Sequence, residues 1–86
     1  MSYEVDLVFM RADNPSKKVT LKAHPDDDIV DYVLLAAKKL GFNPDDPVGI
    51  ATTDGRPVKI VGRPVRDVVM QRGNVFILGS EDILGW

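Results

Sequence analysis

The chain ends in a short segment, GSEDILGW at residues 79–86, that could do chemistry through a backbone carboxylate instead of a side chain. If Trp86 is removed, the carboxylate of Gly85 becomes the chain end. Glycine suits this role because it has no side chain to block a narrow enzyme channel, and its backbone adopts dihedral angles that other residues avoid. The plainer interpretation is a frayed end, which many domains have. The segment therefore predicts either a reactive terminus at Gly85 after removal of Trp86, or an ordinary chain end.

The four residues before this glycine are suited to recognition by an enzyme. Ile83 and Leu84 could fill apolar subsites along the channel, and Glu81 and Asp82 could pair with basic residues of the enzyme. Charge pairs of this kind contribute to the choice of partner more than to affinity. We expect the chain to be the group that is transferred, with its chemistry performed by other proteins.

Side chains that usually perform catalysis are scarce in this sequence. His24, the one histidine, precedes a proline at a predicted strand–helix junction, a position more typical of a cap or surface residue than of a catalyst. Cysteine is absent, which excludes a thiol nucleophile and thiolate metal sites. Asp26, Asp27 and Asp28 precede a predicted helix, and we favour helix capping over a metal site because no second ligand cluster accompanies them. We expect a protein that is not an enzyme and holds no metal or cofactor.

The composition is that of a soluble globular protein, with 44% hydrophobic and 28% charged residues and a net charge of −2. Its 86 residues are enough for one domain with a single core. The charge indicates neither a nucleic-acid groove nor a membrane-surface patch. No apolar run approaches the ~18 residues of a membrane span, and the first residues lack a signal-peptide pattern. We expect a cytoplasmic protein with no nucleic-acid partner and no membrane partner.

Hydrophobic periodicity predicts the elements that must position the tail. Apolar residues at helical spacing run from Ile29 to Leu40, which predicts a helix with Gly41 just past its end. Alternating apolar residues and turn signals divide most of the remaining chain into strands. The predicted strands cover residues 3–10, 17–23, 48–52, 57–61 and 75–78. Between the last two, residues 65–72 are expected to form a single helical turn.

This order of elements predicts an α+β fold of the β-grasp type. One helix that follows a hairpin must cover one face of a mixed sheet of four to five strands, with the last strand beside the first. A central last strand would be covered on both faces, which explains why the whole run 75–78 is apolar. We assign residues 1–79 to the β-grasp domain and residues 80–86 to a flexible tail with a processing site after Gly85.

The sheet face away from the helix is a candidate partner-binding surface, because exposed apolar patches mark such sites. It would hold Val8 and Met10 with one alternating pair of the last strand, either the residues at 75 and 77 or those at 76 and 78. Scattered apolar residues are also normal on protein surfaces. The predicted patch consists of Val8, Met10, Phe76 and Leu78.

The chain resembles the ubiquitin-like proteins, and it is closest in pattern to the ubiquitin-fold modifier, which ends in a single reactive glycine. The resemblance covers most of the chain after residue 17. The sequence LAAKKL at 35–40 resembles that family's helix end, and the Asp54-Gly55 turn and the basic-Gly pair at 72–73 occupy matching places. In that alignment Gly85 lies at the terminal glycine, and Trp86 lies where a peptidase removes the last residues.

The resemblance implies a protein modifier precursor. A processing peptidase would remove Trp86, an E1-like activating enzyme would use ATP on Gly85, and an E2-like conjugating enzyme would transfer it to target proteins. Two features depart from the family. Its tail has arginines where this chain has Glu81 and Asp82, which implies an activating enzyme with a basic groove. The paired glycines of ubiquitin and of the sulfur carriers are also missing, so an outlying member, such as a bacterial ubiquitin-like modifier, fits better.

Two other functions stay open at this point. A β-grasp interaction module could bind a partner through its sheet and never use its terminus. A sulfur carrier for cofactor biosynthesis is less favoured, because this chain has one glycine in place of two and continues to Trp86.

Overall fold

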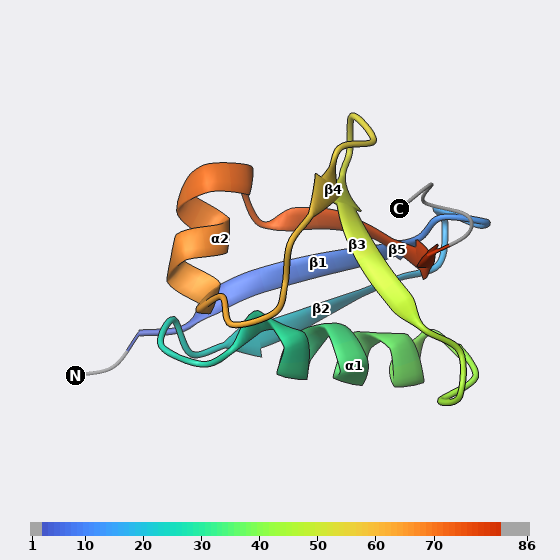
Figure 1. Ribbon diagram of the computed structural model, residues 1–86, viewed down its shortest axis with the longest axis horizontal. Helices are drawn as coiled ribbons and strands as arrows, with labels where there is room; N and C mark the ends of the chain where they lie inside the picture. Colours follow the sequence, from blue (N-terminus) through green and yellow to red (C-terminus); the bar gives the residue numbers. More distant parts are fainter. Residues whose placement is uncertain (1–2, 82–86) are drawn as a thin grey trace.

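The computed structural model describes residues 3–81, and Figure 1 shows a curved sheet with α1 lying across one of its faces. The shorter helix, α2, lies near the beginning of β5 and the beginning of β1. In chain order the elements are β1 (Val5–Arg11), β2 (Lys18–Ala23), α1 (Ile29–Lys39), β3 (Val48–Thr52), β4 (Pro57–Val58), α2 (Val65–Arg72) and β5 (Val75–Ser80).

The sheet has the strand order β2-β1-β5-β3-β4, which confirms the predicted β-grasp fold with the last strand in the centre. β5 pairs in parallel with β1, where Phe9 lies opposite Phe76, and antiparallel with β3, where Ile50 lies opposite Leu78. The other pairs are antiparallel. A strand with neighbours on both sides and a helix over one face loses most of its contact with water, which agrees with its apolar sequence.

The core lies between α1 and the sheet. Ile29, Val33 and Ala36 of α1 are fully buried, as the helical spacing predicts. On the sheet, Phe9 and Phe76 are also fully buried, and their ring centroids lie 5.7 Å apart with the rings tilted by 31°. Tilted aromatic pairs at this distance add about 0.5–1.5 kcal/mol to the stabilisation from burial alone. This contact joins β1 to β5 and so fixes the strand from which the tail leaves.

Several elements differ in length from the prediction. The fourth strand stops at Val58, because the chain then turns at Ile60, whose carbonyl accepts from the Arg63 amide. Residues 65–72 form a complete helix instead of one turn. β5 continues to Ser80, which pairs with Val48. The last strand therefore ends two residues later than the predicted 78.

The three consecutive aspartates do not cap α1 through their side chains, contrary to the prediction. Asp28 occupies the N-cap position with an extended backbone, but its carboxylate accepts no capping hydrogen bond. The Asp26 carboxylate pairs instead with Arg66 of α2, and Asp27 accepts a hydrogen bond of 2.7 Å from the Tyr32 hydroxyl. One contact to the start of α2 and one contact to a tyrosine of α1 thus take the place of the expected caps.

The backbone explains why these side-chain caps are dispensable. The segment before α1 runs beside the segment before α2, with the Ile29 amide donating to the Arg63 carbonyl at 3.0 Å and the Val65 amide donating to the Asp27 carbonyl at 2.9 Å. Each helix start thus has its first amide satisfied by the other segment, which removes part of the need for a capping side chain.

Candidate functional site

The chain leaves the sheet at the end of β5. Ser80, the last residue of β5, lies opposite Val48, the first residue of β3, and Glu81 follows with an exposed side chain. The remaining residues of the predicted site lie outside the described residues, so their predicted roles stay predictions. They are Asp82, Ile83, Leu84, Gly85 and Trp86.

The predicted patch on the open face of the sheet is half wrong. Phe76 and Leu78 are fully buried under α1, so they cannot contribute to a surface on the other side. The open face carries the alternate pair of β5, with Val75 37% exposed and Ile77 partly exposed. Alternation alone could not choose between the pairs, because all four residues are apolar.

The other two predicted patch residues do lie on the open face. Val8 and Met10 are partly exposed, and the register places Val8 opposite Val75 and Met10 opposite Ile77. Ala51 of β3 continues the second row beside Ile77. Ala51 is only 1% exposed, so the exposed apolar strip consists of the residues of β1 and β5. Lys18 and Lys22 are exposed on β2 beside it, and Lys22 pairs with Asp6 at 3.3 Å.

A second apolar surface lies near the end of β5, at residues that no sequence pattern singled out. A hollow of about 560 Å³ opens between the second half of α1 and the connector at residues 41–48, and we call it the α1 hollow. Its apolar lining consists of Leu34, Ala37, Phe42, Pro44 and Val48. Leu34 and Leu35 are both apolar residues outside the buried stripe of their helix, and the sequence alone does not indicate which of them lines the hollow.

Two smaller hollows adjoin the α1 hollow through shared residues. One, of about 260 Å³, lies between Asp46 and Glu81, and the other, of about 450 Å³, lies between Val48, Val61 and Glu81. Asp46 and Val48 also line the α1 hollow. We call the three hollows together the exit surface, because Glu81, the last described residue, borders two of them.

Arg11 holds one wall of the α1 hollow in place. Its guanidinium donates to the carbonyl of Leu40 at 2.6 Å and stacks over the ring of Phe42. It also makes two bonds to Asp13, at 2.8 and 2.9 Å, and these lower the pKa of that carboxyl below its ordinary value. The connector after α1 is therefore tied to the end of β1, and the hollow does not depend on a loose loop.

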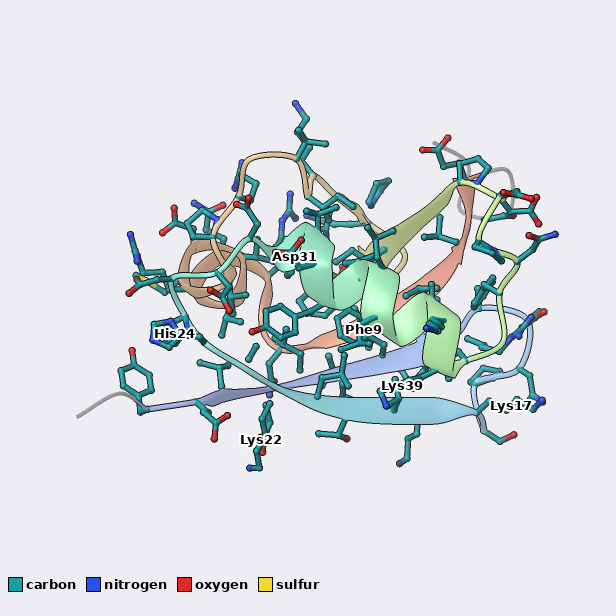
Figure 2. All side chains as sticks on the ribbon, turned by 90° about the horizontal axis from the view of Figure 1, so that it is seen from below. Phe9, Lys17, Lys22, His24, Asp31 and Lys39 are labelled. Atoms are coloured by element: carbon teal, nitrogen blue, oxygen red, sulfur yellow. The ribbon has the colours of Figure 1, made fainter. Side chains whose placement is uncertain are left out.

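The other polar side chains considered from sequence are dispersed. Figure 2 shows Phe9 beneath α1, with Lys22 projecting away from β2 and His24 lying at the junction before the helix. The His24 ring accepts a hydrogen bond of 3.2 Å from the Asp26 amide at Nδ1, which is a local turn contact. Within residues 3–81, no helix is long and apolar enough to cross a membrane.

Comparison with known proteins agrees with this topology. A similar solved structure is the NMR solution structure of a computationally designed protein based on the template of human erythrocytic ubiquitin. It matches with a TM-score of 0.60 and 18% sequence identity, over 93% of this chain and 91% of that one. The fold is ubiquitin-like. No protein-family model matches the sequence, and no curated protein does. At 18% identity the similarity concerns the ubiquitin-like fold alone.

Proposed function

We propose that this ubiquitin-like chain is the precursor of a protein modifier. A processing peptidase removes Trp86, an E1-like activating enzyme acts on Gly85, and an E2-like enzyme transfers it to target proteins. The observation that supports this most is the position of β5, which is central in a ubiquitin-like sheet and ends at Ser80, shortly before Gly85. The protein itself is the transferred group and not an enzyme.

The proposed chemistry needs only the terminal carboxylate of this chain. Hydrolysis of the bond between Gly85 and Trp86 frees that carboxylate. The carboxylate then attacks the α-phosphorus of ATP and displaces pyrophosphate, and a cysteine thiolate of the activating enzyme displaces AMP. A cysteine thiolate of the E2-like enzyme displaces the first thiolate, and a target amine or hydroxyl then displaces the second. A glycine at this position leaves the carbonyl open to each attack.

Mass spectrometry tests the proposal directly. The full chain is incubated with ATP in extract from cells that contain its gene, and the products are searched for loss of Trp86 and for targets joined to Gly85. The Gly85→Ala variant should lose the adducts while keeping the fold. Ser16→Ala, in the exposed turn between β1 and β2, serves as the control and should keep them. Trp86 retained in the functional protein, or adducts unchanged by Gly85→Ala, would refute the proposal.

A second function is favoured by the apolar strip on the open face. Val75 is 37% exposed and adjoins Val8, Met10 and Ile77, which would suit non-covalent binding of a partner. In that case Val75→Asp should abolish partner binding, while Gly85→Ala should leave it unchanged. The opposite pattern would favour the modifier.

A further inference from the structure

The exit surface brings apolar hollows and the start of the tail to one place. The α1 hollow and the hollow beside Val61 share Val48, and Glu81 lies on the border of the second. Leu34 is 57% exposed at the edge of the α1 hollow, although a leucine there adds little to the core. Exposed apolar residues that line a concave surface are more informative than single exposed ones.

Among the described residues, the acidic side chains on the exit surface form no ion pairs, whereas several acidic side chains elsewhere in the chain do. Asp13, Asp26 and Asp54 each pair with an arginine. By contrast, the carboxylates of Asp46 and Glu81 have no ion pair within residues 3–81, and the neighbouring Asp45 has none there either. Lys38 and Lys59 also line hollows of the exit surface, so the surface carries both signs of charge. The carboxylates of Asp45, Asp46 and Glu81 are the groups there that a basic partner could pair with.

The length of the tail limits where an enzyme acting on it can bind. Gly85 is four residues beyond Glu81, a distance of at most roughly 14 Å for an extended chain. An enzyme that encloses the bond after Gly85 must bring its own surface close to Glu81. The two smaller hollows, which border Glu81, are then part of the area that this enzyme covers, and the α1 hollow continues from them because it shares Asp46 and Val48 with them.

We propose that the exit surface is the docking site of the enzyme that acts on the tail. This inference rests on the proposed modifier function and names the chemistry of its partner. The enzyme inserts an apolar side chain into the α1 hollow beside Leu34 and places basic side chains against Asp46 and Glu81. Binding through the globular domain gives the enzyme affinity that a short tail cannot supply, and the acidic rim selects a basic enzyme surface.

Two leucines on the same helix provide the test. Leu34 lines the α1 hollow, whereas Leu35, 43% exposed, lies outside its lining. Replacing either with Glu places a carboxylate four residues before a lysine, Lys38 or Lys39, a pairing that helices tolerate well. Both variants should therefore fold. Leu34→Glu should slow loss of Trp86 or formation of Gly85 adducts in the extract by about tenfold or more, while Leu35→Glu should keep the wild-type rate.

A charge reversal tests the acidic rim separately. Asp46→Lys should slow the same reaction. Glu4→Lys makes an equal charge change at an exposed residue outside the exit surface and should not slow it. Added salt should lower the reaction rate of the wild-type protein and reduce the difference in rate between it and Asp46→Lys, because salt screens exposed charges. A synthetic peptide of residues 79–86 lacks the α1 hollow and should react more slowly than the full chain.

The outcomes distinguish the two proposals. If the wild-type chain keeps Trp86 and forms no adduct at Gly85, the modifier function fails, and the docking inference fails with it. If the wild-type chain reacts but Leu34→Glu matches Leu35→Glu, or the peptide matches the full chain, the docking inference alone is overturned.

Discussion

The guanidinium of Arg11 lies over the ring of Phe42, with its central carbon 4.2 Å from the ring centroid. The same group donates to the carbonyl of Leu40, just past the end of α1. Arginine combines a flat face for stacking with several donors in one plane, so a single side chain can make both contacts at once. The end of β1 thereby holds the connector that forms one wall of the α1 hollow.

Replacing Arg11 by Lys should lower the thermal midpoint of unfolding, because an ammonium group cannot stack flat on Phe42 while it donates in the same plane. The loss should exceed that of Asp13→Asn, which removes only an exposed ion pair of small value. Thermal unfolding followed by circular dichroism measures both midpoints. Equal midpoints for the two variants would show that the contacts to Phe42 and Leu40 contribute nothing.

The two faces of β5 should respond differently to truncation. Phe76→Ala removes a fully buried ring and should lower the free energy of unfolding by about 3–5 kcal/mol. Val75→Ala, on the open face, should cost less than about 1 kcal/mol. Urea unfolding gives both values, and Phe76→Leu can replace Phe76→Ala if the latter does not fold. Similar losses at the two positions would contradict the assignment of the faces.

Gly73 ends α2 with φ 80° and ψ −169°, a conformation that is almost confined to glycine. A Cβ there would meet no atom within 4 Å, so the cost of Gly73→Ala comes from the backbone alone. We expect a loss of about 1–3 kcal/mol in the free energy of unfolding. Gln71→Ala, an exposed helix position, serves as the control and should change it little. A neutral Gly73→Ala would mean that the turn before β5 has another conformation.

The turn between β3 and β4 should make stability depend on pH. Thr52 donates a hydrogen bond to Asp54 and thereby lowers the pKa of that carboxyl below its ordinary value of 3.8, with Arg56 nearby. A lowered pKa in the folded state stabilises the fold above the pKa of the unfolded chain, and this stabilisation is lost as the pH falls through the folded value.

Asp54→Asn should therefore be less stable than the wild-type protein at pH 7, and the gap should shrink as the pH falls below about 4. Urea unfolding at a series of pH values measures the difference. Asp31→Asn, at an exposed acid with no ion pair within residues 3–81, is the matched control. A gap that stays constant with pH would contradict the effect at Asp54.

The β-grasp topology was predictable from the sequence because each element has a local signal. The apolar spacing from Ile29 to Leu40 can form only one buried face as a helix, and the Asp54-Gly55 pair favours a tight turn. Strand order followed from this sequence of elements, since one helix after a hairpin must cover the sheet. The ends of the elements were not predictable in the same way, because they depend on tertiary pairing. Ser80, for example, belongs to β5 only because it pairs with Val48.

Only the tertiary structure decided which surfaces the fold presents. All four residues at 75–78 are apolar, so the buried pair is selected by which face α1 covers, and that choice placed Phe76 in the core and Val75 outside. The sequence predicted that the aspartates before α1 act as caps. In the structure Asp26 pairs instead with Arg66, which is 40 residues away and could not be predicted from a local pattern. Val48, which lines the α1 hollow, lies beside Ser80 at the start of the tail because β3 pairs with β5, and no local pattern connects these two segments.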